Sequence, residues 1–335
     1  MEKLPLVSVL IPIYGVEAYV QEALRSVLIQ DYPQMEVVLV DDCSPDQSVS
    51  LAQEVVEREN PQHHRVKWLH HESNQGLAVA RLSALHAAEG EYLFFLDSDD
   101  YWNSPSMVRE VISQMMECSA HLAIFNYIEQ RSRGSRKVKV LGIEDSLQQT
   151  VAYLKGEASA YLWNKCFLRE DFLSKAAVWL PSCNLWEDLH NVPLYTFQTK
   201  RITYIDKYYL TYRRLPNSIT NNLSPIARAS VWAIHQDLMQ RFYDLEYTDE
   251  EACKAVYEAL EVNALLTHMI RLKTGSFKAY KEIARERTDW KEAISQRKGW
   301  SARWDAWVLF LNRIGCYRLG FALFRLKIHL IKMML

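Results

Sequence analysis

The chain has few cysteines and no long apolar run. Its six cysteines are scattered through 335 residues without a C-x-x-C pair, which excludes a zinc ribbon or a disulfide scaffold and favours a reducing, cytoplasmic setting. No window approaches the ~18 uncharged apolar residues that a membrane-spanning helix needs. The apolar segment 4–14 is followed by Glu17 and not by a small-x-small cleavage pattern, so it indicates a first strand and not a signal peptide.

Neither sign of charge dominates the composition. Lysine and arginine number 39 against 41 aspartates and glutamates, a formal net charge of −2, which gives no overall attraction to a nucleic acid polymer. Apolar residues make up 49% and charged residues 24%, as in ordinary globular proteins, and this excludes wholesale disorder. The length allows two domains.

Short apolar runs alternate with helical patterns through the first 130 residues. The runs are rich in β-branched residues, and between them apolar residues recur at spacings of three and four; the runs are 7–13, 36–40, 66–69, 92–96 and 121–125. This order predicts an α/β fold with a doubly wound, mostly parallel sheet, whose ligands bind at the carboxyl ends of the strands. From about Pro225 the pattern is helical, so we predict an α/β domain over residues 1–222 and a helical region over residues 223–335.

Three carboxylates stand directly after one of the apolar runs, in the sequence Asp97-Ser98-Asp99-Asp100. Concentrated negative charge is unfavourable unless a cation offsets it, and Mg²⁺ or Mn²⁺ binds carboxylate and phosphate oxygens. In extended backbone Asp97 and Asp99 point to the same side, so this D-x-D pattern indicates a metal and nucleotide site. The alternative is a turn or a helix cap before the helical segment 105–117.

Two further segments point to the same kind of site. Asp41 and Asp42 follow the run 37–40, and a carboxylate there can accept from a base N–H or a ribose hydroxyl. Asn74-Gln-Gly76 opens a helix that carries Arg81. The free backbone N–H groups of such a helix start, together with the arginine, suit an anionic ligand.

Taken together, these segments resemble the nucleotide-sugar domain of family 2 glycosyltransferases, which have the GT-A (Rossmann-like) fold. Order and spacing agree over about residues 5–220. The family usually has asparagine where this chain has Gly15 and Leu82. The segments that carry the resemblance are Val9–Tyr14, Val40–Ser44, Asn74–Arg81, Gly90–Tyr92 and Phe95–Asp100.

The resemblance implies a UDP-sugar site. In this site Tyr14 lines the base, and Asp42 accepts a hydrogen bond from the uracil N–H, so that its partner is the base and not the protein core. Arg81 lies near Asp42 and the base. Asp97 is the ribose or metal-shell carboxylate, and Asp99 is the direct ligand of the Mn²⁺ or Mg²⁺ that bridges to the diphosphate. The nucleotide-binding set so implied is Pro12, Tyr14, Asp42, Asn74, Arg81, Asp97, Ser98 and Asp99.

Transfer to a hydroxyl group also needs a base, because an alcohol is a poor nucleophile until its proton is being removed. Glu187 and Asp188 stand beside Trp186 and resemble the Glu-Asp pair that marks the family's catalytic base. This implies Asp188 as the base and Glu187 as a supporting acceptor contact. The alternatives are a helix first turn, where acids are common, and His190 as a rival base.

Basic residues further along the chain suit the diphosphate or the acceptor. Tyr212-Arg213-Arg214 resembles the family's Tyr-Arg segment, whose arginines can clamp a diphosphate, and Trp163-Asn164-Lys165 resembles an acceptor-side segment. We therefore assign Lys165, Arg213 and Arg214 to the diphosphate or the acceptor. The basic run 131–139 has two interpretations, a solvated hairpin or a loop that contacts phosphate or acceptor.

The last 35 residues form an amphipathic pattern, which we interpret as one long helix from Ser301. Large apolar residues recur at sevenfold spacing, and no acidic residue follows Gly315. Such a helix suits peripheral binding to an anionic membrane, on the inner face of the cytoplasmic membrane. Packing on the protein or a homodimer seam is the alternative. The cations assigned to the membrane are Arg313, Arg318, Arg325, Lys327 and Lys332.

These features favour an inverting, metal-dependent glycosyltransferase that moves a sugar from a UDP-sugar to a saccharide or lipid-linked saccharide in surface polysaccharide synthesis. The inverting course and the surface-glycan setting come from the resemblance alone. A nucleotidyltransferase is one alternative, but Gly15 is the only glycine before Gly76, which argues against a glycine-rich phosphate loop. A non-catalytic saccharide- or membrane-binding relative is the other, and the intact Asp99 and Asp188 argue against it.

Overall fold

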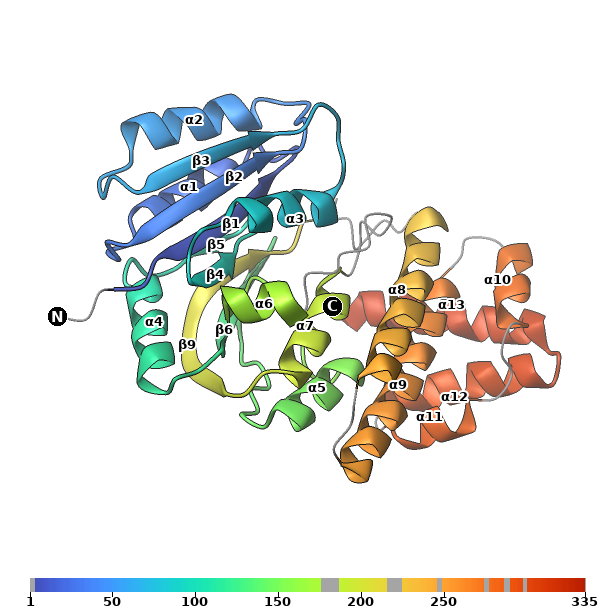
Figure 1. Ribbon diagram of the computed structural model, residues 1–335. Helices are drawn as coiled ribbons and strands as arrows, with labels where there is room; N and C mark the ends of the chain where they lie inside the picture. The colour runs from blue at the N-terminus through green and yellow to red at the C-terminus, as the bar shows by residue number, and fades with distance from the viewer. Residues whose placement is uncertain are drawn as a thin grey trace. The chain divides into compact units, whose positions relative to one another are not determined.

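The computed structural model describes seven stretches of the chain, residues 4–175, 187–215, 225–245, 249–273, 277–285, 290–297 and 300–334. The chain divides into two compact units (Figure 1). The first comprises Met1–Tyr153 and Glu157–Asn222, and the second comprises Leu154–Gly156 and Leu223–Leu335.

Within the described residues, nine strands of the first unit form one mixed sheet in the order β3-β2-β1-β4-β8-β6-β9-β5, with β7 paired to β6. Strands β3, β2, β1 and β4 are parallel, whereas β8 runs antiparallel between β4 and β6. The strands are β1 (Val7–Ile13), β2 (Met35–Asp41), β3 (Arg65–His70), β4 (Tyr92–Phe95), β5 (Tyr101–Trp102), β6 (Leu122–Arg131), β7 (Gly134–Val138), β8 (Lys165–Leu168) and β9 (Ile202–Arg213).

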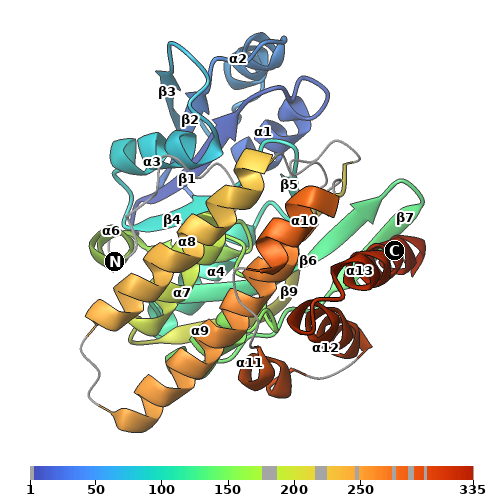
Figure 2. The ribbon, with the colours of Figure 1, turned by 90° about the vertical axis from the view of Figure 1, so that its right-hand side faces the viewer.

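Helices cover both faces of this sheet, which confirms the predicted doubly wound α/β fold. The sheet is mixed and not mostly parallel, since β8, β7 and β5 pair antiparallel with their neighbours. One face packs against α1 (Val20–Leu28), α2 (Ser48–Arg58) and α4 (Met107–Glu117). The other packs against α3 (Leu77–Ala87), α6 (Arg169–Lys175) and α7 (Glu187–Phe197) (Figure 2). Helix α5 (Ser146–Leu154) follows β7 in the chain (Figure 1). Because both faces are covered, every residue of β1 is buried, which is why the strand has a continuous apolar run and no alternation.

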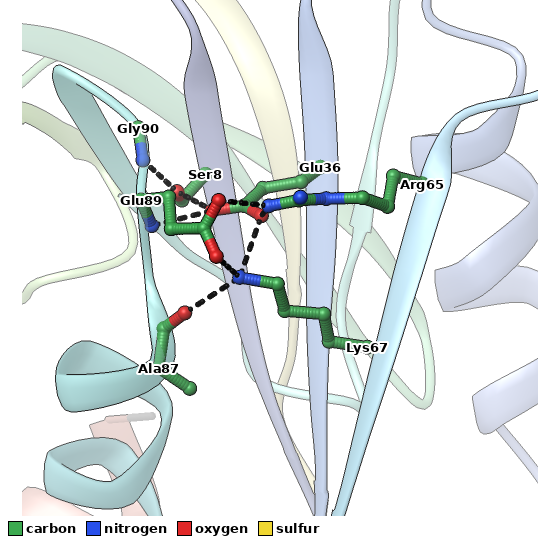
Figure 3. A network of polar contacts seen from close by, with 7 residues as sticks. All are labelled: Ser8, Glu36, Arg65, Lys67, Ala87, Glu89 and Gly90. Carbon is green, nitrogen blue, oxygen red and sulfur yellow. Dashed lines mark hydrogen bonds and ion pairs between the residues drawn. The ribbon is translucent and has the colours of Figure 1, made fainter.

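A buried carboxylate joins three strands of the parallel half of the sheet (Figure 3). Glu36 on β2 is fully buried and accepts from Ser8 Oγ at 2.6 Å and from the Glu89 backbone N–H at 2.6 Å. Its other oxygen pairs with Arg65 and, at 3.2 Å, with Lys67. Burial opposes ionisation of Glu36, but these hydrogen bonds outweigh it and hold the pKa at about 2.

We expect this carboxylate to make the fold sensitive to acid. The pKa of Glu36 falls from its ordinary 4.5 to about 2 on folding, which corresponds to about 3 kcal/mol of stability. Because the pKa of Glu36 is lowered on folding, its contribution to the free energy of unfolding is complete above pH 4.5 and disappears as the pH falls toward 2. Roughly half of that contribution should be lost at pH 3. Urea unfolding at pH 6 and pH 3 should show a smaller loss in Glu36→Gln than in the wild type. Equal losses of stability in Glu36→Gln and in the wild type would contradict this role of Glu36.

The described residues of the second unit form six helices, as the helical pattern predicted. Helix α8 packs on α9, α11 on α9, and α12 on α13. Their shared core contains Leu265, Tyr280, Trp290, Val308 and Phe324. The helices are α8 (Pro225–Asp244), α9 (Glu250–Arg271), α10 (Phe277–Ala284), α11 (Lys291–Ser295), α12 (Trp300–Arg313) and α13 (Tyr317–Met334).

The predicted single helix from Ser301 is wrong, because the chain turns between α12 and α13. Gly315 has φ +79°, a left-handed conformation that glycine adopts without strain. The N–H of Cys316 donates back to the Leu311 carbonyl at 2.8 Å, which closes the end of α12 as such glycine-terminated helices commonly do.

In the part of the chain that the structure describes, no helix combines the length and the apolar character needed to cross a membrane.

Candidate active site

Three residues singled out in the sequence follow neighbouring parallel strands. Tyr14 follows β1, Asp42 follows β2, and Asp97 follows β4. The carboxyl ends of parallel strands meet at one edge of a sheet, so these side chains share that edge. Tyr14 is 48% exposed and its ring is available to a nucleotide base, whereas Pro12 is buried within β1.

The Asp42 carboxylate is held by the start of α3. It accepts from the backbone N–H groups of Gln75 at 2.8 Å and Gly76 at 2.7 Å, and its Oδ1 lies 2.7 Å from His71 Nδ1. Asp42 therefore takes the two amides directly before the first turn of α3, and those two are not free for an anionic ligand. The expectation that Asp42 serves only the base is corrected accordingly, since replacing it also removes the acceptor of the Gln75 and Gly76 amides.

Other residues near this helix start take different places. Asn74 is exposed beside the capped amides. His71, which the sequence did not single out, also lies 2.9 Å from Ser83 Oγ and so links Asp42 to α3. Gly15, where the resembling family has asparagine, has φ +65°, and both residue types tolerate that left-handed conformation. The departure at Gly15 thus preserves the local backbone.

Arg81 joins the two acidic motifs that lie farthest apart in the sequence. Its guanidinium donates to Asp97, to Glu187 and, at 2.9 Å, to Asp188 Oδ1. The side chain is almost fully buried. The guanidinium is thus paired with these three carboxylates and not with Asp42, and its expected place near the base stays a prediction. A buried guanidinium needs carboxylate partners, and the D-x-D segment and the first turn of α7 supply them.

The cluster around Arg81 keeps an excess of negative charge. One cation faces three carboxylates, Asp97, Glu187 and Asp188. Burial raises the pKa of Glu187 to about 7, although Arg81 lowers it. Burial also raises the pKa of Asp188, with Arg81 and a backbone hydrogen bond from Leu162 opposing the rise. A carboxylate with a raised pKa is a better proton acceptor, so this arrangement suits general base chemistry.

The second half of the D-x-D segment is fixed by Arg213. The Arg213 backbone N–H donates to Asp100 at 2.7 Å, and its guanidinium donates to the Asp99 carbonyl at 2.5 Å. The same guanidinium pairs with Glu22 and lies 4.5 Å from the ring centroid of Tyr101. Arg213 is thus committed to protein partners and supports the segment, contrary to the expectation that it clamps a diphosphate.

The Asp99 carboxylate suits a divalent cation. Burial raises its pKa to about 6, and the Asp97 charge adds to the rise, so a cation there would relieve an unfavourable charge. No residue that the structure describes forms an ion pair with Asp99. Within the same described stretches, no group of three or more His, Cys, Asp or Glu side chains could hold a metal ion. A metal at Asp97 and Asp99 would therefore need further oxygen ligands from a bound diphosphate, as Mg²⁺ commonly takes.

Lys165 is an internal support and not a ligand contact. It is fully buried, and its ammonium donates to the carbonyls of Ser159 at 3.1 Å and Tyr161 at 2.6 Å and to Asn164 Oδ1 at 2.9 Å. Burial lowers its pKa to about 7. The assignment of Lys165 to the diphosphate or acceptor is corrected, because all three ammonium hydrogens have acceptors within the protein.

Aromatic side chains form a platform next to Asp188. The rings of Tyr161 and Trp163 are stacked with centroids 4.6 Å apart, and those of Trp163 and Tyr212 with centroids 5.3 Å apart. Tyr161 is 37% exposed, and burial and the Asp188 charge both raise its pKa. Tyr161 was not singled out in the sequence, although its spacing of two from Trp163 in an extended segment would have placed both rings on one side.

The remaining predicted residues are placed as follows. Ser98 is buried between the two aspartates, and Arg214 is 39% exposed at the side chain. His190, the rival base, is buried on α7 with Nδ1 3.4 Å from Asn191 Oδ1. Trp186, which stands beside the paired acids, lies outside the described residues.

The glycosyl transferase family 2 model matches residues 8–173. A putative teichuronic acid biosynthesis glycosyltransferase of Bacillus subtilis, TuaG, is 35% identical over 143 residues, which cover 43% of this chain and 55% of that protein. The matches span 38 to 63% of the lengths of the first three curated relatives.

Solved structures agree in fold. Staphylococcus aureus TarS 1–349 in complex with UDP-GlcNAc superimposes with a TM-score of 0.71 at 20% identity, over 96% of this chain and 92% of that one. The Pyrobaculum calidifontis mannosyltransferase PcManGT, in complex with GDP-Man and Mn²⁺, superimposes with a TM-score of 0.52 at 17% identity, over 97% of this chain and 85% of that one.

Proposed function

Because residues 8–173 belong to glycosyl transferase family 2, we propose that the chain transfers one sugar from a UDP-sugar to a hydroxyl group of a saccharide or lipid-linked saccharide. The observation that carries this proposal is the convergence of Asp97, Glu187 and Asp188 on Arg81. It unites the donor-side acids with a candidate base at one edge of the sheet. The UDP-GlcNAc in the TarS structure supports UDP as the carrier.

The proposed reaction is a direct displacement. The acceptor oxygen forms a bond to the anomeric carbon while the bond from that carbon to the diphosphate oxygen breaks, and the hydroxyl proton passes to Asp188. One base opposite the leaving group gives inversion at the anomeric carbon. Arg81 keeps the Asp188 carboxylate oriented at 2.9 Å, and Glu187 positions the acceptor.

Asp97 and Asp99 would hold Mn²⁺ or Mg²⁺, which when bound neutralises charge on the departing diphosphate. Tyr14 would stack on the base, and Asp42, held by the start of α3, would accept from it. We place these functions in the α/β unit, residues 1–222. The cellular setting that we propose is cytoplasmic surface-polysaccharide assembly, in line with the names of TuaG and TarS, which is a poly(ribitol-phosphate) β-N-acetylglucosaminyltransferase.

A panel of UDP- and GDP-sugars tests this function. A bound donor raises stability by RT ln(1 + [L]/Kd), about 2.7 kcal/mol at one hundred times Kd, so the true donor should raise the melting temperature in the presence of Mn²⁺. The same donor should release its nucleoside diphosphate when acceptor is added, and chelation should stop the release. If no sugar nucleotide of the panel stabilises the protein and none is turned over, the proposed function is wrong.

The second unit offers a surface for an anionic membrane. Helices α12 and α13 expose large apolar side chains, and the single acid in this stretch, Asp305, is buried and neutralised by Arg297 at 2.8 Å and by Lys327. Lys327 is therefore an internal ion-pair partner, contrary to the membrane role expected for it, and the Lys332 side chain lies outside the described side chains. The exposed arginines and large apolar residues of α12, α13 and the turn between them are Arg303, Trp307, Phe310, Arg313, Ile314, Arg318, Leu319, Arg325 and Leu326.

We expect the double variant Arg318→Gln, Arg325→Gln to bind vesicles of phosphatidylglycerol and phosphatidylcholine roughly 30-fold more weakly at low salt, since each nearby cation contributes about 1 kcal/mol. Lys254→Gln with Lys278→Gln, which removes two exposed cations from α9 and α10, is the matched control. Equal vesicle binding by both double variants would reject the membrane surface. Concentration-dependent dimerisation that is lost on Trp307→Ala would assign the surface to a second copy of the chain.

A further inference from the structure

An arginine cluster stands at one end of the aromatic platform. Glu129 on β6 lies opposite Arg136 of β7 and opposite Tyr212 of β9 in the sheet register. Its carboxylate pairs with Arg131, with Arg136 at 3.4 Å and with Arg214 at 3.8 Å. One buried acid thus faces three arginines, and the cluster keeps a surplus of two positive charges.

Two of these arginines are open to solvent. The side chains of Arg136 and Arg214 are 61% and 39% exposed. Their contacts with Glu129, at 3.4 and 3.8 Å, are longer than a close charge-assisted hydrogen bond. Their guanidinium groups therefore have donors left for an anion.

The platform connects this cluster to the candidate base. Tyr212 is the register neighbour of Glu129 and is stacked with Tyr161, with ring centroids 6.3 Å apart. Tyr161 lies near enough to Asp188 for the charge of that carboxylate to raise the pKa of the Tyr161 hydroxyl. Asp188, the exposed ring of Tyr161 and the arginine cluster thus follow one another along one surface of the first unit.

We propose that the acceptor is an anionic saccharide, bound with a sugar ring on Tyr161 and with a carboxylate or phosphate group at Arg136 and Arg214. This rests on the proposed function. Aromatic faces suit the apolar faces of sugar rings, and arginine matches carboxylate and phosphate oxygens with paired donors. The hydroxyl that reacts then lies toward Asp188, and the anionic group fixes the direction in which the acceptor chain enters.

The neighbouring residue on β7 supplies a matched control. Side chains alternate along a strand, so Lys137 points to the face opposite Arg136, where its ammonium lies 5.0 Å from the ring centroid of Tyr208. Arg136→Gln and Lys137→Gln therefore remove the same charge from adjacent positions of one hairpin, and only the first faces the platform.

Binding is measured by calorimetry with UDP and Mn²⁺ present. The probes are a hyaluronan tetrasaccharide, its carboxyl-reduced neutral counterpart, and a glycerol phosphate trimer. The wild type should bind at least one anionic probe about 10-fold or more tightly than the neutral one, and the better of the two identifies carboxylate or phosphate. Arg136→Gln and Arg214→Gln should each weaken that binding by about 10-fold, as loss of a charged hydrogen bond does, whereas Lys137→Gln should not.

Two further measurements keep the outcomes separate. Thermal melting identifies any variant that fails to fold, and Arg136→Lys, which keeps the charge, should recover part of the affinity. If no anionic probe binds the wild type more tightly than the neutral one, or if Arg136→Gln behaves as Lys137→Gln does, the proposal is wrong. Donor-induced stabilisation in the same samples shows whether the proposed function survives that result.

Discussion

Replacing Asp188 with asparagine should lower kcat by roughly 100- to 10,000-fold, the range expected when a general base is lost. Asparagine keeps the shape of the side chain but cannot take the acceptor's proton. The substitution also removes one negative charge from a buried cluster in which a single arginine faces three carboxylates. The variant should therefore fold as well as the wild type and bind UDP with Mn²⁺ at nearly unchanged affinity.

Neighbouring residues control for this result. Glu187→Gln should be milder and should raise the acceptor KM, because its proposed role is positioning. If Asp188→Asn transfers sugar at the wild-type rate while His190→Ala does not, the base is His190. If both variants are fully active, the proposed one-step displacement is wrong.

Asp99→Asn should lower metal-dependent turnover by roughly 100-fold or more, because the diphosphate would lose the cation that offsets its charge. The local fold should persist, since Arg213 holds this segment through the Asp99 backbone carbonyl and not through its carboxylate. Electron paramagnetic resonance of Mn²⁺ with UDP should show weaker metal binding in the variant.

Asp100→Asn is the contrasting substitution. The Asp100 carboxylate is buried and accepts from the Arg213 backbone N–H at 2.7 Å, so its loss should appear mainly as lower thermal stability. Near-wild-type rates of Asp99→Asn in the presence of a chelator would show that the reaction does not use a metal at this position.

The layout of the sheet could be predicted because it depends on local patterns. Continuous apolar runs such as that of β1 predict strands buried on both faces, and the acids after the runs 36–40 and 92–96 predict polar groups at the carboxyl edge. Tyr14, Asp42 and Asp97 do follow three neighbouring strands.

The partners of the charged residues could not be predicted in the same way. Arg81 meets Glu187 across 106 positions of the chain, and nothing near either residue encodes that meeting. Lys165 and Lys327 are typical surface residues by type, yet both are buried, since each finds acceptors or a carboxylate that offsets the cost of desolvation. Charge in a sequence indicates what a residue can bind, but the partner depends on the tertiary fold.

Helix α3 connects two tasks that are described above separately. The amides of Gln75 and Gly76, directly before its first residue, hold Asp42. Arg81, within the helix, holds carboxylates of the D-x-D segment and of α7. At 1.5 Å of rise per residue, Gly76 and Arg81 lie about 7 Å apart along the axis of this helix. If Asp42 binds the base and Asp188 takes the acceptor proton, as we propose, the two functions share one helix. On that proposal, a donor that displaces Asp42 would also displace Arg81 and with it the Asp188 carboxylate, so we expect donor selectivity in turnover as well as in affinity.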